Sequence, residues 1–205
     1  DVIMLQASGA GQAAANGGVN TIVSSKVAKS EINKSNITSS GNIEVKSSAK
    51  NDIDLTVVGG AGAGELAITG AVNTIVSSDS IDANIKESTL QTTVANNSQE
   101  DSGIILKAEN SLGIYGHAGL LSGAGGVAAG GAIVTGVITN SVNAFVQNSD
   151  LIASNIILSS VVDETMGTSS NPFITIAVAG SGGASISGAV NTLVLNSSSN
   201  TKVKG

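Results

Sequence analysis

The side chains that could do chemistry in this chain are few in kind. Carboxylates are the only catalytic groups in quantity, with 15 Asp and Glu residues against a single His and no Cys. The pairs Asp52/Asp54 and Asp79/Asp82 are spaced so that they could hold Ca²⁺ or act as an acid and a base. Asp52 and Asp54, however, alternate with apolar residues, which predicts that both are solvent-exposed charges on a strand.

Several residue types that would complete an active site are missing. All nine basic residues are Lys, and there is no Trp. Sugar-cleaving β-helices would normally bring arginines and aromatic rings that stack on sugars. His117 has no Cys or second His to form a metal site, and the glycine string Gly59–Gly64 lacks the Lys and the following helix of a phosphate-binding loop. We therefore predict a non-enzymatic chain with no catalytic residue, no metal site and no cofactor.

One nine-residue motif recurs along the chain. It reads GGVNTIVSS at residues 17–25, GAVNTIVSS at residues 70–78 and GAVNTLVLN at residues 188–196, with a looser copy, TGVITNSVNAFV, at residues 135–146. The Asn residues of these copies are Asn20, Asn73, Asn191 and, in the loose copy, Asn140. We interpret them as a structural ladder, buried or lining a turn, whose amides bond to unpaired backbone groups, rather than as a ligand site.

The elements around the motif predict an array of similar units. Repetition over about 50–65 residues indicates modules that bury their apolar faces on one another, as in a solenoid. Apolar and polar residues alternate in five segments, as in half-buried strands, and no segment has sustained helical spacing. These segments are Ile43–Lys46, Ile53–Val57, Ile81–Lys86, Ile104–Glu109 and Ile174–Val178. The sequence therefore predicts an all-β protein.

The strand count suggests how each unit folds. A unit holds about five such strands, and a parallel β-helix uses two or three strands per coil, so we expect about two coils per unit. Clusters of Gly, Ser and Asn should form the turns between these strands. Examples are Ser39–Asn42, Gly59–Gly64 and Ser197–Asn200.

Two segments interrupt the alternation and differ between units, Ser88–Ser102 and Val161–Asn171. Insertions in solenoids map to loops, which carry recognition more often than the strands do. We expect these loops, together with the segment His117–Leu120, to contact any partner. The candidate contact residues are Thr92, Asn97, Glu100, Asp101, His117, Asp163 and Glu164.

The charge balance limits the kinds of partner. A net charge of −6 without arginine argues against nucleic acid and against anionic membrane surfaces. The uncharged segment Leu120–Ile138 is long enough to approach a membrane-spanning helix. Because the equivalent segment of the preceding unit carries Glu65, we interpret it instead as a close-packed turn and strand, and expect no membrane contact.

The repeats resemble those of a known group of proteins. Long Gly/Ala/Ser stretches precede GAVNTIVSS, and strands such as SIDANI follow it, in a chain rich in Ile, Asn, Lys and Ser. This resembles the repeat regions of large secreted exoproteins of the filamentous-haemagglutinin and leukotoxin type, and autotransporter passengers, of Gram-negative bacteria. The resemblance implies a right-handed parallel β-helix (β-solenoid), a handedness that crossover preferences also favour. It also implies secretion or exposure on the bacterial surface.

These observations lead to one favoured function and two alternatives. We expect residues 1–205 to be a single β-solenoid segment of a longer repetitive virulence protein, acting as a stalk and a host-cell adhesion surface. Its partners would be a host-cell surface protein or glycan and the neighbouring repeats of the same chain, with open coil ends prone to associate. The alternatives are a leukotoxin-like cytotoxic module that acts on host cells or membranes, and a carbohydrate-active β-helix.

Overall fold

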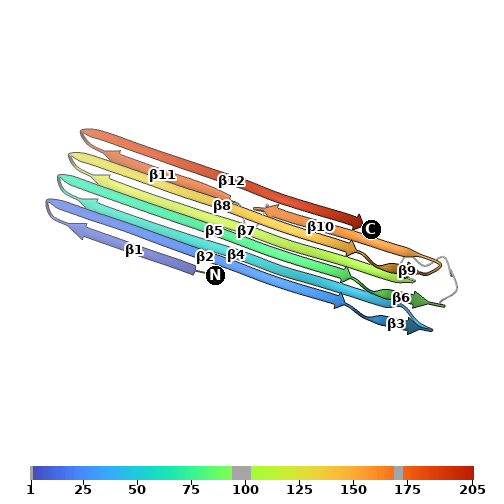
Figure 1. Cartoon of the computed structure of the whole chain (residues 1–205). Coiled ribbons are helices and arrows are strands. Elements are labelled where there is room, and N and C mark those ends of the chain that lie inside the picture. The colour runs from blue at the N-terminus through green and yellow to red at the C-terminus, as the bar shows by residue number, and fades with distance from the viewer. Residues whose placement is uncertain (1, 94–102, 169–172) are drawn as a thin grey trace.

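The structure is a computed structural model that describes residues 2–93, 103–168 and 173–205. These residues form twelve β-strands and no helix (Figure 1). The strands are β1 (Val2–Ala10), β2 (Ala13–Asn33), β3 (Asn36–Ser39), β4 (Ile43–Ala63), β5 (Leu66–Lys86), β6 (Thr89–Thr92), β7 (Ile104–Ala124), β8 (Val127–Gln147), β9 (Asp150–Ile152), β10 (Ile156–Met166), β11 (Phe173–Ser181) and β12 (Ala184–Lys204).

All strand pairs are parallel, and they form three sheets. Sheet A contains β1, β4 and β7, followed by β10 and β11, which both pair with β7. Sheet B has the order β2-β5-β8-β12, and the short sheet C has the order β3-β6-β9. The chain visits sheet A, then B, then C, and returns to A, so that each circuit lies on the one before it (Figure 1). The fold is the all-β, parallel β-helix that the sequence predicts.

Each sequence repeat forms one coil of this helix. Residues of sheet B face their equivalents 53 residues later between β2 and β5, 61 residues later between β5 and β8, and 57 residues later between β8 and β12. The expectation of about two coils per unit is therefore wrong. The strands are much longer than expected, because β4, β5, β7, β8, β2 and β12 each contain 21 residues.

The number of coils was overestimated because two segments predicted as turns lie mostly or wholly within strands. The glycine string Gly59–Gly64 was expected to be a turn, but residues up to Ala63 belong to β4. Likewise Ser197–Asn200 lie within β12, whereas the turn predicted at Ser39–Asn42 is present, with Ser39 as the last residue of β3 and residues 40–42 between β3 and β4. Small residues do not end these strands, because neighbouring coils pair with them on both sides and supply the ladder bonds that hold the extended backbone.

The turn from sheet A to sheet B is only two residues long, and its first position requires glycine where one turn stacks on another. A Cβ on Gly64 would lie 2.1 Å from the carbonyl oxygen of Gly11, and one on Gly125 would lie 2.3 Å from that of Gly64. The Gly64 amide donates to the Gly11 carbonyl at 3.1 Å. Backbones of successive turns thus stack in direct contact, leaving no room for a side chain.

The turn from sheet B to sheet C has a different stacked structure. Lys34, Glu87 and Asn148 occupy equivalent positions there with φ of 49°, 46° and 48°. A serine follows each of them, and its hydroxyl accepts a hydrogen bond from the serine amide of the preceding coil: the Ser88 amide donates to Ser149 Oγ at 3.1 Å. The short sheet C therefore begins at the same place in every described coil.

The core changes in size along the strands. Near sheet C it consists of large aliphatic side chains, including Ile81, Ile85 and Leu106, which are fully buried. Near the glycine turns its apolar cluster contains only alanines, of which Ala67 is fully buried, and Thr69 and Ser122 are buried beside them. Burying each large aliphatic side chain contributes about 1.5–3 kcal/mol, so most of the apolar stabilisation lies in the half of the coil next to sheet C.

The uncharged segment Leu120–Ile138 is part of this solenoid. It comprises the end of β7, the turn at Gly125 and Gly126, and the first half of β8. This confirms the interpretation as a close-packed turn and strand. Among the described residues, none belongs to a helix with the length and apolar content of a membrane span.

Candidate binding surface on the outer face of sheet B

The outer face of sheet B is built from columns of equivalent residues. Because the strands pair in register, every second residue points outward and lies beside its counterparts in the adjacent coils. One such column contains Thr21, Thr74, Thr135 and Thr192. The columns around it contain Gly17, Gly70, Gly131 and Gly188; Val19, Val72, Ile133 and Val190; and Val23, Val76, Val137 and Val194.

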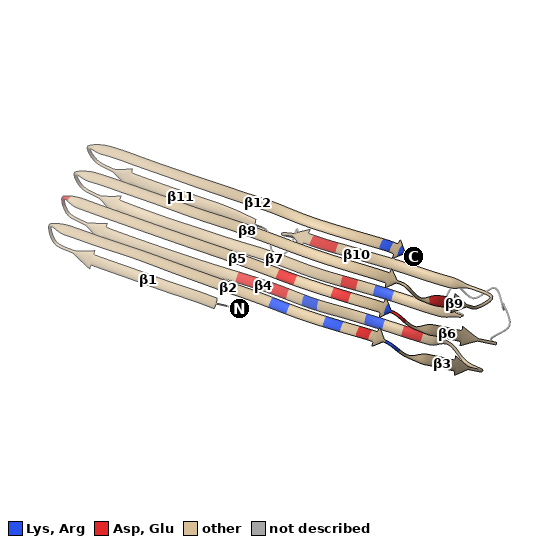
Figure 2. Ribbon diagram, in the orientation of Figure 1, with Lys and Arg blue, Asp and Glu red and all other residues tan. Residues whose placement is uncertain are grey.

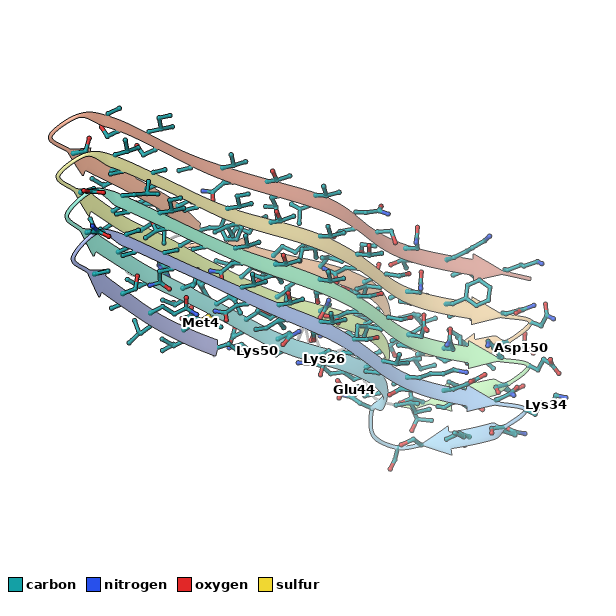
Figure 3. All side chains as sticks on the ribbon, turned by 90° about the vertical axis from the view of Figure 1, so that its left-hand side faces the viewer. Met4, Lys26, Lys34, Glu44, Lys50 and Asp150 are labelled. Atoms are coloured by element: carbon teal, nitrogen blue, oxygen red, sulfur yellow. The ribbon has the colours of Figure 1, made fainter. Side chains whose placement is uncertain are left out.

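We call the outward side chains of residues 13–25, 66–78, 127–139 and 184–196 the Val-Thr face. These residues include no charged side chain. Charges gather instead on the half of the long strands that lies next to sheet C, as Figure 2 shows. Lys34 lies in the turn after β2, and Asp150 is the first residue of β9. Both lie at the end of the molecule next to sheet C (Figure 3). Sheet B therefore presents two chemically distinct surfaces along one set of strands.

The charged half of sheet B contains a hollow of about 770 Å³. Its floor includes Asn84, which is only 7% exposed although its position in β5 alternates outward. Phe145 of β8 is the only aromatic residue in its lining. The lining residues are Lys29, Asp82, Asn84, Lys86, Asn143, Ala144, Phe145, Ser199, Asn200, Thr201 and Lys202.

Hydrogen bonds between coils order the polar side chains of this hollow. Asn143 Nδ2 donates to Asp82 Oδ1 at 2.9 Å, and Asn200 Nδ2 donates to Asn143 Oδ1 at 3.2 Å. These three residues belong to one column, which begins with Lys29 in the first coil. The side chains are thus held along the wall of the hollow by contacts between neighbouring coils.

Glu31 fixes two of the lysines at the hollow. Its carboxylate lies 2.5 Å from Lys29 Nζ and 3.2 Å from Lys86 Nζ. Hydrogen bonds from the two lysines lower the pKa of Glu31, and the hydrogen bond and charge of Glu31 raise the pKa of Lys29. Among the described residues, three lysines and Asp82 line the hollow and Glu31 lies beside them, so these side chains carry 3 − 2 = +1 although the whole chain carries −6.

Asn20 and Asn73 lie in the middle of strands, facing the core. Asn73 is fully buried, and its Nδ2 donates to the carbonyl oxygens of Leu55 at 3.1 Å and His117 at 2.7 Å on the opposite sheet. Asn20 Nδ2 donates to the Thr56 carbonyl at 3.0 Å. These amides join sheets A and B, and neither residue lies in a turn.

The other two asparagines differ from this pair. Asn191 is equivalent to Asn73 and its Nδ2 also donates to a backbone carbonyl, that of Phe173 at 3.5 Å, but it lies in the last coil and is exposed. Asn140 is not equivalent, because the register places Val134 opposite both Asn73 and Asn191. The loose copy was therefore misaligned. Asn140 instead faces the core beside Asp79, and its Nδ2 donates to Glu164.

Asp79 and Asp82 do not form a pair. Asp79 faces the core and is 3% exposed, accepting from the Lys26 amide at 3.2 Å and from Asn110 Nδ2 at 3.3 Å. Asp82 points to the outer face, in the hollow. Asp52 is exposed on the outside of β4 and lies 3.3 Å from Lys50 Nζ. Among the described residues, no group of three His, Asp or Glu side chains could hold a metal ion.

Thr92 and His117 were expected in loops but belong to strands. Thr92 ends β6, is 5% exposed, and donates from Oγ1 to the Gly41 carbonyl at 2.7 Å. His117 points outward from the middle of β7, with Nδ1 3.4 Å from Thr56 Oγ1. The loop expectation fails for His117–Leu120 because strand alternation continues through Gly119.

The first six residues of the segment 161–171 are also strand, and residues 169–171 lie outside the described residues. Residues up to Met166 form β10, in which Asp163 is exposed and Glu164 faces inward to accept from Asn140 and Ser197. Asp163 lines a smaller hollow of about 340 Å³ on the outside of sheet A. The remaining candidates, Asn97, Glu100 and Asp101, lie outside the described residues.

Sequence reasoning missed Phe145 and the amides around it. The repeat could have revealed these residues. Aligning GAVNT at residues 70–74 and 188–192 with GAIVT at residues 131–135, instead of with the loose copy, places Asp82, Asn143 and Asn200 in one column. In comparisons with known proteins, no family model, no curated protein and no solved structure matches this chain.

Proposed function

We propose that this chain is a non-enzymatic β-solenoid segment of a secreted or surface-exposed bacterial protein, and that it binds an acidic glycan of a host cell through the hollow on sheet B. The hollow carries this proposal because it combines lysines, amides and one aromatic ring on a rigid sheet. Amides can both donate to and accept from sugar hydroxyls. Lysines supply the charge that a carboxylated sugar needs, and Phe145 offers an apolar surface.

The size of the hollow supports this class of ligand. Pockets for small ligands usually measure about 300–1,000 Å³, and the hollow falls within that range. It is open rather than enclosed, lying across the strands β2, β5, β8 and β12, so a glycan chain could continue beyond it. The resemblance of the repeats to those of large bacterial exoproteins supports the proposed location and the adhesive role.

The dimensions of the coils favour a broad binding surface over a long stalk. Four coils at about 4.8 Å per strand span only about 19 Å along the solenoid axis, whereas a 21-residue strand is about 70 Å long. A stalk of useful length would need many more such coils. Each added coil instead widens the two large sheet faces, and binding by several shallow sites in a row would gain avidity.

Binding of 3′-sialyllactose tests the proposal. We expect measurable binding by isothermal titration calorimetry, weaker binding of neutral lactose, and weakening by added salt because the lysines act through charge. Phe145→Ala should reduce affinity at least about tenfold, the change that 1.4 kcal/mol produces. Tyr115→Ala, which removes the outward-facing ring of β7 on sheet A, is the matched control and should leave affinity unchanged.

Two results would contradict the proposal. One is an absence of binding to sialylated and uronic-acid glycans at millimolar concentration. The other is an equal loss of binding in the Phe145 and Tyr115 variants, which would place the ligand elsewhere.

A further inference from the structure

At its centre, the Val-Thr face is more uniform between coils than the core behind it. Its Gly, Thr and second Val columns are the same residue in all four coils. The core columns of the same strands vary: one contains Ile22, Ile75, Gly136 and Leu193, and the Asn column includes Val134. Packing inside one molecule constrains the core more strongly than the surface, so uniformity on the outside calls for a contact outside the molecule.

The glycine column gives independent support. A Cβ built on Gly70, Gly131 or Gly188 would meet nothing within 4 Å, and none of them has a positive φ. Glycine within a strand costs roughly 0.5–1 kcal/mol relative to alanine. No contact among the described residues requires these glycines, in contrast to Gly64 and Gly125 in the turns. A groove kept open for a neighbouring surface accounts for them.

The exposed valines form ridges on either side of the threonine column. Val23 on the outermost strand is 74% exposed, and Ile133 and Val137 on the inner strand β8 are still 40% and 38% exposed. Exposed apolar patches of several hundred Å² on a soluble protein usually mark an interaction site. The corresponding part of the outer face of sheet A is less regular, since its residues Thr56, His117 and Ile174 share one column.

We propose that the Val-Thr face binds the Val-Thr face of a second copy of this chain, giving a two-fold symmetric dimer. The face measures about 40 Å by 19 Å, or about 750 Å², from the strand rise and spacing. A stable complex of standard size buries about 800 Å² per partner. The uncharged half of sheet B is therefore close to the area that a dimer needs, and the face carries no charge that pairing would bury.

A two-fold axis parallel to the solenoid axis makes the face complementary to itself. The axis would pass between the Gly column and the neighbouring column of Val19, Val72, Ile133 and Val190. The ridge of each copy then enters the glycine groove of the other copy. Such an arrangement is isologous, the usual symmetry of homodimers. The strands of the two copies then run in opposite directions, and the hollow around Phe145 lies beyond the partner's glycine turns and stays open.

Filling the groove tests the proposal without disturbing the fold. We would compare the variant carrying Gly70→Val and Gly131→Val with a control carrying Gly62→Val and Gly123→Val. The control glycines also have open space at the Cβ position and also point outward, but from sheet A. Both variants should keep the β circular dichroism spectrum and melt at or above the temperature of the unchanged chain, because valine favours strands.

Sedimentation equilibrium then decides the outcome. We expect a monomer–dimer equilibrium for the unchanged chain and for the control, and a dissociation constant at least about tenfold higher for the groove variant. A chain that stays monomeric at high micromolar concentration overturns the proposal. So does a series of ever larger species, which indicates association through open coil ends, or an equal effect of the two variants.

A lipid surface is the competing occupant of an uncharged apolar face. Co-sedimentation with phosphatidylcholine vesicles distinguishes it from the dimer. Vesicle binding by a chain that does not dimerise in solution, lost on introducing Val76→Glu and Val137→Glu, would overturn the dimer in favour of a membrane contact. Dimerisation with no vesicle binding supports it.

Discussion

At the scale of single residues, the buried asparagine of the second coil connects the two long sheets. We predict that Asn73→Ala lowers the free energy of unfolding by about 1–3 kcal/mol, because its amide bonds to two backbone carbonyls are lost in a dry environment. Urea unfolding followed by circular dichroism measures this. Asn191→Ala is the control, since the equivalent side chain in the last coil is exposed, and a comparable loss there would contradict the account.

The ion pairs around Glu31 predict a pH dependence. The pKa of Glu31 is lowered in the fold, so its stabilising contribution is complete above the usual Glu value of 4.5 and is lost as the pH falls through the lowered value. The pKa of Lys29 is raised, so its contribution is present below 10.5 and is lost only as the pH rises through the raised value. Between these limits the contribution of the pair is constant.

Thermal unfolding of the Glu31→Gln variant checks this dependence. We expect its melting temperature to lie slightly below that of the unchanged chain from weakly acidic to weakly basic pH. The difference should disappear in strong acid, where Glu31 is protonated in both states of the unchanged chain. A difference in melting temperature that grows as the pH falls would contradict a lowered pKa of Glu31.

The sequence predicted residue roles only where the repeat alignment was right. It identified Asn20 and Asn73 as structural amides that bond to the backbone. It included Asn140 because the loose copy was placed at residues 135–146, whereas the register aligns GAIVTGV with GAVNTIV and places Val134 in that position. Which asparagine is equivalent depends on pairing between coils, which the local sequence does not specify.

At the scale of elements, the stacked glycine turns define where sheet A ends. We predict that Gly125→Ala lowers the free energy of unfolding by at least about 2 kcal/mol, because its Cβ would lie 2.3 Å from the Gly64 carbonyl oxygen and the backbone must shift. Gly131→Ala, six residues later on the outer face, is the control. It should be neutral or stabilising by roughly 0.5–1 kcal/mol, because its Cβ has open space.

Glycines within strands explain why the lengths of the strands were harder to predict from the sequence than their presence. Alternation correctly predicted strands over segments such as Ile53–Val57 and Ile81–Lys86. It did not show that the glycine string after Val57 continues the same strand, because glycine has no side chain with which to mark a face. Only the stacking distances separate turn glycines such as Gly64 from strand glycines such as Gly62.

At the scale of the whole molecule, the solenoid is a flat stack of wide coils. Composition and repeat length predicted the class of fold, because small and β-branched residues suit a thin core between two sheets. They did not predict the coil width, which depends on whether one repeat makes one circuit or two. This difference also bears on the proposed function, because only one wide coil per repeat places Lys29, Asp82, Asn143 and Asn200 on directly neighbouring strands.

A disulfide between adjacent coils tests this register most directly. The chain has no cysteine, so Asp82→Cys with Asn143→Cys introduces a unique pair. Directly paired parallel strands lie about 4.8 Å apart, within the range of about 4.4–6.8 Å that disulfides span between Cα atoms. We predict that mild oxidation of dilute protein forms an intramolecular disulfide in this variant but not in Asp82→Cys with Ala144→Cys, where the second residue faces the core. If two coils formed per repeat, the first pair would be about 9.6 Å apart and could not be bridged, so its failure to oxidise would contradict the one-coil architecture.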